Sequence, residues 1–132
     1  MKKDSSVAFN AQILLDICKS KNIHSCAVVT SLKKNKSVYN LSKKLVDEIN
    51  SLGENALFCD KIDSLDLEEE SSLKIYFAPN PNRDSLSYNF CKLSDAVVFI
   101  EKYGYSNHYE FEDMIGFLRK RDIEILGVWG LR

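Results

Sequence analysis

Short apolar runs alternate along the chain with segments in which apolar residues recur every three or four positions. The runs predict strands at 24–30, 56–59, 73–77, 96–100 and 123–129. The periodic segments predict helices at about 6–20 and 37–52, a third helix capped by Asp84 and a fourth that begins at Asn107. Alternating strands and helices are typical of an α/β fold. We therefore expect a three-layer sandwich around a mainly parallel sheet of about five strands.

Each predicted helix carries one apolar stripe that should face the sheet. In chain order the stripes are Val7, Ala11, Leu14, Leu15 and Cys18; Val38, Leu41, Leu45, Ile49 and Leu52; Leu86, Phe90 and Leu93; and Phe111, Met114, Ile115 and Leu118. The first strand is apolar on both faces from Cys26 to Val29, so we place it at the centre of the sheet. Gly53 is expected just beyond the end of the second helix.

The composition narrows the classes of protein that fit this pattern. The chain has 132 residues, 18 basic and 19 acidic, and a net charge of −1. This length predicts a single domain over residues 1–132, and the balanced charge offers no bulk attraction to nucleic acid. No apolar run approaches the ~20 residues of a membrane-spanning helix, and no uninterrupted apolar stretch marks a secretory signal. We expect a cytoplasmic protein without direct membrane insertion.

Four widely spaced cysteines, Cys18, Cys26, Cys59 and Cys91, show none of the spacings of a zinc site. Three of them stand inside apolar runs, which favours buried, reduced thiols. We expect no bound metal. His24 and His108 have no Ser or Cys nucleophile at a recognisable spacing, so surface or capping roles are expected for both.

The loop after the first strand is the first place to look for chemistry, because ligands of parallel sheets bind at the carboxyl ends of strands. A phosphate-binding loop has the form G-x-x-x-x-G-K-[ST] between a strand and a helix. Lys36-Ser37 occupies the Lys-Ser position of this pattern. Thr30 and Asn35 stand where its two glycines belong.

The residues from Ala27 to Asp60 resemble the nucleotide-binding half of the MinD/ParA-like P-loop ATPases. Their similarity is greatest to the bacterial tyrosine autokinases of capsular and exopolysaccharide synthesis. The resemblance is carried, in order, by Thr30-Ser31, Lys36-Ser37, Asn40-Leu41-Ser42, Gly53 and Leu57-Phe58-Cys59-Asp60. The segments 94–100 and 125–129 resemble two later strands of the family. The resemblance implies a P-loop NTPase-like fold, with Asp60 matching a Mg-associated carboxylate.

Two departures from the family pattern decide the expected function. Without the loop glycines, side chains crowd the backbone nest that would hold a triphosphate. Ala78 stands at the position of the family's metal-organising Asp, and a methyl group cannot help to hold hydrated Mg²⁺. We therefore expect no catalytic residue, no metal and no cofactor. At most, weak anion binding is expected at Lys33, Lys34, Lys36, Ser37 and Asp60.

The resemblance implies a degenerate, non-catalytic relative of these kinases, a pseudoenzyme that regulates or scaffolds polysaccharide synthesis or export. Its implied partner is a protein, the cytoplasmic end of a membrane chain-length regulator. An alternative is a nucleotide-binding ATPase or tyrosine kinase that uses ATP and Mg²⁺ through an atypical loop. A third hypothesis, a flavodoxin-like receiver or phosphotransfer module, lacks the acidic residues or the cysteine that it needs.

Two surface features remain open from the sequence. Lys33, Lys34 and Lys36 would form either an anion site or a solvated basic loop. Tyr103, Tyr105 and Tyr109 would be phosphoacceptors, a contact patch or a roof over the carboxyl edge of the sheet.

Overall fold

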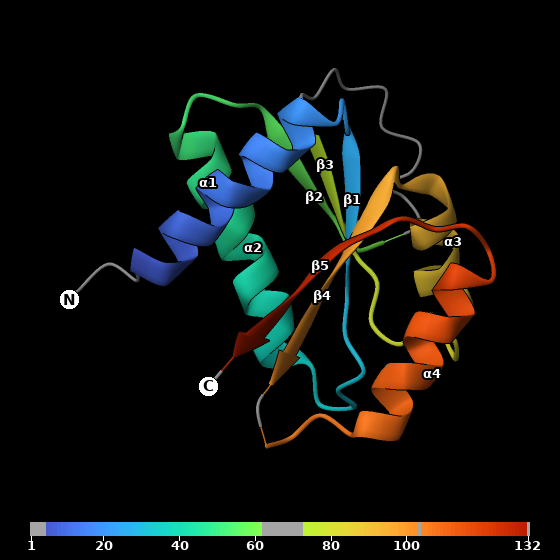
Figure 1. Ribbon diagram of the computed structural model, residues 1–132. Coiled ribbons are helices and arrows are strands. Elements are labelled where there is room, and N and C mark those ends of the chain that lie inside the picture. Colours follow the sequence, from blue (N-terminus) through green and yellow to red (C-terminus); the bar gives the residue numbers. More distant parts are fainter. Residues whose placement is uncertain (1–4, 62–72, 103, 132) are drawn as a thin grey trace.

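The computed structural model describes residues 5–61, 73–102 and 104–131, and Figure 1 shows the arrangement of their helices and strands. The helices are α1 (Ser5–Ser20), α2 (Lys36–Ser51), α3 (Ser85–Leu93) and α4 (His108–Arg119). The strands are β1 (Ser25–Val29), β2 (Ala56–Cys59), β3 (Leu73–Phe77), β4 (Ala96–Lys102) and β5 (Ile125–Leu131). The predicted order of elements is confirmed. The acidic stretch 60–72, which its sequence favours as a solvated connection, lies mostly outside the described residues, as does Tyr103.

The five strands form one sheet in the order β2-β3-β1-β4-β5, and every pairing in it is parallel. Cys26 lies opposite Ile75 of β3 and Ala96 of β4, so β1 is central, as predicted. Residues 26–29 are fully buried because helices cover both faces of this strand. Since all the strands run the same way, their carboxyl ends meet at the lower edge of the sheet in Figure 1.

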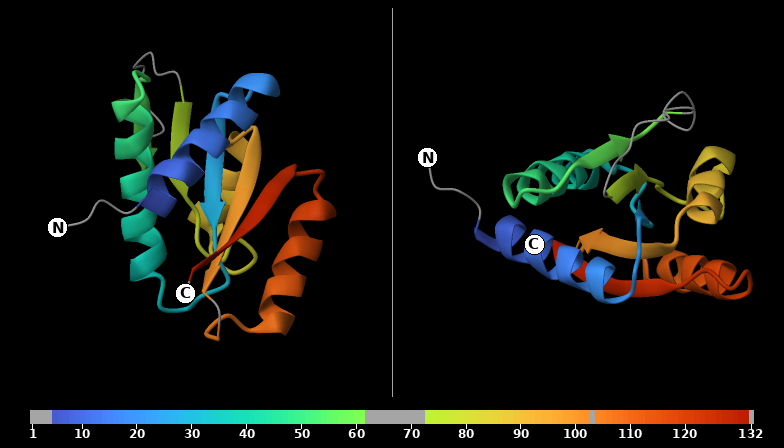
Figure 2. Two further views of the ribbon diagram at one scale, coloured as in Figure 1. Left: turned by 60° about the vertical axis from the view of Figure 1, so that its left-hand side comes forward. Right: turned by 90° about the horizontal axis from the view of Figure 1, so that it is seen from above.

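Successive residues of β1 belong to two different apolar cores, one on each face of the sheet. Cys26 and Val28 pack with α1 and α2, whereas Ala27 and Val29 pack with α3 and α4. Figure 2 shows the resulting three layers from above. The α/β sandwich expected from the sequence is therefore confirmed.

The stripe predicted for α1 is buried over its whole length, with Ala11, Leu14 and Cys18 at most 2% exposed. Two other predicted stripe residues are exposed, Leu52 by 50% and Leu93 by 54%. Leu52 is the C-cap of α2, where the chain turns away through Gly53 at φ +93°, and Leu93 is the last residue of α3. In α3 the buried face is instead Ser87, Phe90 and Cys91.

The last strand begins two residues later than predicted. After α4 the chain turns through Asp122, whose φ of +57° lies in the left-handed region. The backbone N–H of Ile123 then donates to the Leu118 carbonyl, which extends the turn at the end of α4. Ile123, the first apolar residue of the predicted strand, thus belongs to the turn at the end of α4.

All four cysteines are free and buried, which confirms the predicted buried thiols. Burial raises the pKa of the Cys91 thiol to about 12. Burial, with a smaller contribution from the Asp95 carboxylate, raises the pKa of Cys18 to about 11. These thiols stay protonated at neutral pH. Among the described helices, none is long and apolar enough to cross a membrane.

Candidate functional site

A cleft opens at the carboxyl edge of the sheet because neighbouring strands send their chains to opposite faces. After β1 the chain turns to the face covered by α2, whereas after β4 it turns to the face covered by α4. Such divergence leaves the crevice in which parallel sheets commonly bind ligands. The cavity between the two loops has a volume of about 480 Å³. We call it the β1–β4 cleft, and its lining residues are Ser31, Leu32, Lys33, Lys34, Ser37, Lys102, Tyr105, Asn107 and Glu110.

A buried carboxylate, that of Glu101 in β4, ties the two walls of this cleft together. Its side chain accepts a 2.8 Å hydrogen bond from the backbone N–H of Ser31 and a 2.7 Å bond from the Ser31 hydroxyl. The hydroxyl of Ser106, in the opposite wall, donates to the same carboxylate. Glu101 is only 8% exposed. Three donors on one buried carboxylate make strong, charge-assisted hydrogen bonds that hold both loops in place.

The backbone N–H groups of the first residues of the β1–α2 loop therefore donate hydrogen bonds to groups within the protein. Ser31 donates to Glu101, and the N–H of Leu32 donates to the Thr30 hydroxyl at 3.2 Å. A phosphate-binding loop instead directs successive N–H groups at the phosphates. Asn35, the N-cap of α2, makes no side-chain capping bond. The loop keeps the Lys36-Ser37 pair of the P-loop pattern but not the backbone N–H groups that begin its phosphate cradle.

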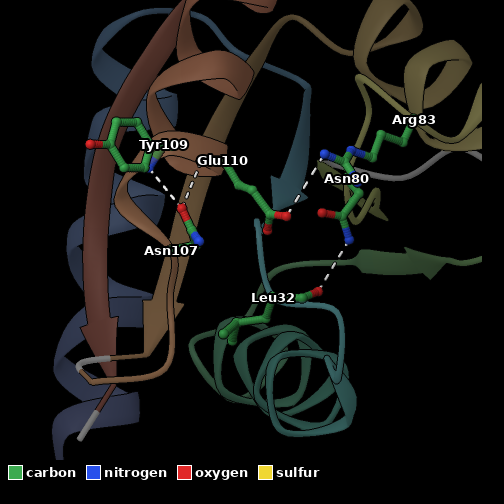
Figure 3. A network of polar contacts seen from close by, with 6 residues as sticks. All are labelled: Leu32, Asn80, Arg83, Asn107, Tyr109 and Glu110. Atoms are coloured by element: carbon green, nitrogen blue, oxygen red, sulfur yellow. Dashed lines mark hydrogen bonds and ion pairs between the residues drawn. The ribbon is translucent and has the colours of Figure 1, made fainter.

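The loop after β3 lies directly against the loop after β1. The backbone N–H of Ala78 donates to Val28, and that of Asn80 donates to Thr30. The Asn80 side chain adds a 3.1 Å bond to the Leu32 carbonyl, as Figure 3 shows. Ala78 is fully buried beside the loop. The expected metal-organising position thus reaches the site but brings only a methyl group to it.

Of the five residues predicted to bind an anion, three line the cleft: Lys33, Lys34 and Ser37. Lys36 is exposed at the start of α2. Asp60 follows β2, which β3 separates from β1, and its carboxylate accepts a 2.7 Å hydrogen bond from the Tyr39 hydroxyl. That hydrogen bond, together with burial, raises the pKa of the Tyr39 phenol. Asp60 thus anchors a tyrosine of α2, beside the edge strand.

The opposite wall of the cleft supplies residues that the sequence did not connect with the lysine loop. The ammonium of Lys102 lies 4.5 Å from the ring centroid of Tyr105, whose side chain is 74% exposed. Asn107 caps α4, since its side-chain oxygen accepts from the N–H groups of Tyr109 and Glu110. The sequence alone identifies Tyr105 as part of an aromatic cluster and Asn107 as a helix cap. That both lie across a cleft from Lys33 follows only from the order of the strands.

Positive charge prevails among the described residues of the cleft. Three lysines line it, and the carboxylate of Glu110 lies toward Arg83 at 3.8 Å (Figure 3). Ser31 is 2% exposed and its hydroxyl donates to Glu101, so this hydroxyl is not placed to attack a substrate. His24 precedes β1 at the amino edge of the sheet, and its backbone N–H donates to Asp95. The arrangement is suited to attracting an anionic group.

No family model matches the chain, and neither a curated protein nor a solved structure matches it.

Proposed function

We propose that this protein is a non-catalytic relative of the MinD/ParA-like P-loop ATPases that regulates or scaffolds polysaccharide synthesis or export. The order of motifs from Thr30-Ser31 to Asp60 supports the relationship. The observation that carries the non-catalytic part is the contact of Ser31 with the buried Glu101 carboxylate. The pathway follows from the resemblance, and the protein acts in the cytoplasm.

A buried carboxylate behind the loop opposes the binding of a triphosphate. A phosphate pressed against Ser31 would approach the negative charge of Glu101, which the same residue binds. At an effective dielectric constant of about 20, two like charges about 5 Å apart repel by roughly 3 kcal/mol. This corresponds to about a hundredfold in affinity. Free N–H groups would have to offset that cost, and those of Ser31 and Leu32 are already bonded.

The residues at the expected magnesium positions also support a protein without phosphoryl-transfer activity. Mg²⁺ takes oxygen ligands, usually one or two carboxylates together with substrate phosphates. At the end of β3 the position is Ala78, which has no oxygen in its side chain. At the end of β2, Asp60 accepts the hydrogen bond of Tyr39. Neither strand presents a carboxylate to the β1–β4 cleft.

The proposed activity is exerted through protein contacts, and the resemblance suggests the cytoplasmic end of a membrane chain-length regulator as the partner. Tyr105 and Tyr109 are 74% and 80% exposed near the carboxyl edge. Exposed tyrosines are common anchors of protein interfaces because they bury a large area at low entropic cost.

The position of the cleft favours one alternative function. It lies where nucleotides bind in parallel sheets, and Lys33, Lys34 and Ser37 line it. These features are compatible with an ATPase or tyrosine kinase that binds ATP and Mg²⁺ in an atypical way. Such a protein would select ATP over other polyphosphates.

Titration with nucleotides separates the two functions. We expect no Mg-dependent phosphate release and no phosphotyrosine above the level of a Lys36→Ala variant. In calorimetry, ATP, GTP and pyrophosphate should bind weakly and alike, and higher salt should weaken all three. ATP binding that discriminates against GTP, survives high salt and disappears in Lys36→Ala or Lys34→Ala would establish the alternative.

Gene disruption tests the proposed pathway. It should change the amount or length of the surface polysaccharide, and an unaltered polysaccharide would contradict a role in that pathway.

A further inference from the structure

We propose that the β1–β4 cleft is the docking site for an acidic segment of a partner protein, with a carboxylate of that segment held between lysines of the two walls. This inference rests on the proposed function, in which the protein acts through protein contacts. It assigns those contacts to one face of the molecule and gives the partner a chemistry.

The charges of the cleft complement a carboxylate. Lys33 and Lys34 come from the β1–α2 loop, and Lys102 comes from the opposite wall at the end of β4. Glu110 also lines the cleft, but its carboxylate lies toward Arg83. Figure 3 shows Glu110 directed toward the loop that carries Arg83 and Asn80. Lysines from both walls therefore line the same cleft. The Glu110 carboxylate is paired with Arg83 rather than with these lysines.

The polar groups of the cleft favour a ligand that accepts hydrogen bonds. The side-chain oxygen of Asn107 is occupied by the N–H groups of Tyr109 and Glu110. Its amide nitrogen, which only donates, lies on the side away from α4 in Figure 3. Ser37 adds an exposed hydroxyl in the first turn of α2. Ammonium, amide N–H and hydroxyl groups together match a carboxylate, which only accepts.

The interior of the loop favours a carboxylate over a phosphate. Ser31 and Leu32 have given their N–H groups to Glu101 and Thr30, so they offer no close cradle. The negative charge of Glu101 repels a dianion more strongly than a singly charged group. A carboxylate held near the rim by flexible lysine side chains avoids both disadvantages.

The rim of the cleft favours a protein segment over a small acid. The phenol ring of Tyr105 is exposed beside Lys102, and the side chain of Leu32 gives the lining an apolar part. Aromatic and aliphatic groups around a charged centre are typical of interface anchors. A volume of about 480 Å³ accommodates more than one side chain. An acidic residue next to an apolar residue is the pattern that this cleft fits.

The test uses the full chain and a fluorescein-labelled peptide in which Glu alternates with Leu and Ser. Its counterpart has Gln in place of every Glu. In fluorescence anisotropy at low salt, the acidic peptide should bind about tenfold or more tighter than the Gln peptide. Its affinity should fall several-fold when salt is raised. Lys33→Gln with Lys34→Gln, and separately Lys102→Gln, should each weaken binding about threefold to tenfold.

Two matched controls distinguish the cleft from general surface charge. Lys43 and Lys44 are an exposed pair on α2 outside the lining of the cleft, and replacing both by Gln should leave the affinity unchanged. Tyr105→Phe should bind nearly as well as the unaltered chain, whereas Tyr105→Ser should weaken binding. Circular dichroism of every variant checks that the fold is retained.

Three results would overturn the docking inference. The first is equal affinity for the Glu and Gln peptides, and the second is a loss of peptide affinity in the Lys43/Lys44 variant equal to that in the cleft variants. The third is displacement of the peptide by inorganic pyrophosphate at concentrations well below the dissociation constant of the peptide. The last result would make the cleft a phosphate site. Phosphate release from Mg-ATP, measured on the same samples, tests the proposed function separately. Hydrolysis would contradict that function whatever the peptide does, and absent peptide binding contradicts only the docking site.

Discussion

At the scale of single residues, Glu101 determines the form of the candidate site. Its carboxylate joins the loop after β1 to the loop before α4 through Ser31 and Ser106. An ionised group that is 8% exposed is stable there only because donors surround it. The same bonds that order the cleft remove N–H groups from phosphate binding, so structure and proposed function depend on one side chain.

Glu101→Ala should lower the free energy of unfolding by about 1–3 kcal/mol, because it leaves the buried N–H of Ser31 without its acceptor. Ser106→Ala removes one donor and should cost about 1 kcal/mol. Glu112, exposed on α4, provides the control, and its change to Ala should stay within about 0.5 kcal/mol. Urea denaturation of the three variants measures these values. A Glu101→Ala variant as stable as the Glu112 control would show that the carboxylate does not hold the loops.

The sequence identified only part of the site for a reason that Glu101 illustrates. Lys33, Lys34 and Ser37 lie within one short loop, so their proximity follows from spacing alone. Glu101 contacts Ser31 across 70 positions of the chain, and no spacing rule reaches that far. Asp60 follows a strand much as expected, but β3 lies between that strand and β1.

At the scale of elements, helix starts were the most predictable feature. Asp84 accepts a 2.9 Å hydrogen bond from the N–H of Ser87, and Asn107 accepts from two N–H groups of α4, so both predicted caps are confirmed. Asn107 and Glu110 have the spacing of a capping box, but the Glu110 carboxylate lies toward Arg83 instead. Local hydrogen bonds can be inferred from neighbouring residues, whereas this contact joins the first turn of α4 to the loop before α3.

The capping bonds predict unequal effects of two substitutions at helix starts. Asp84→Ala should destabilise the protein by about 1 kcal/mol, because α3 loses the acceptor of its Ser87 N–H. Asn35→Ala should cost less than about 0.5 kcal/mol, because Asn35 makes no side-chain bond to α2. Thermal and urea unfolding give both values. The reverse ranking would contradict the assignment of the caps.

Exposed ends limited the prediction of apolar stripes. Leu52 and Leu93 keep the helical spacing, but each stands where its helix ends and the chain turns away from the sheet. A periodic pattern records which face a helix would bury, not where the helix stops. The stripe of α1 was fully predicted because all its residues lie well inside a long helix.

At the scale of the whole molecule, the sequence predicted the layers but not the order of the strands. The central place of β1 follows from its apolar residues, since only a strand covered on both faces buries four in succession. The insertion of β3 between β2 and β1 depends on long-range packing. The resulting order differs from the 2-1-3-4-5 order of flavodoxin-like sheets, which argues against a receiver or phosphotransfer module.

Alternate residues of β1 belong to the two apolar cores, so the same strand supports both. We therefore expect the two cores to unfold as one cooperative unit. Leu14 lies in the core under α1 and Met114 in the core under α4, and both are at most 1% exposed. Changing either to Ala should cost about 2–5 kcal/mol. Trp129, the single tryptophan, packs against the Leu14 core, so its fluorescence reports one face while circular dichroism reports both.

In each variant the fluorescence and dichroism midpoints in urea should coincide and shift together, because β1 connects the two faces and a chain of this length usually unfolds in one step. The informative variant is Met114→Ala, whose cavity lies on the face away from the Trp129 contacts. If the molecule unfolds cooperatively, the stability lost in Met114→Ala lowers the midpoint measured by Trp129 fluorescence as much as the midpoint measured by circular dichroism. If Met114→Ala lowered the dichroism midpoint and left the fluorescence midpoint in place, the two faces of the sheet would unfold separately.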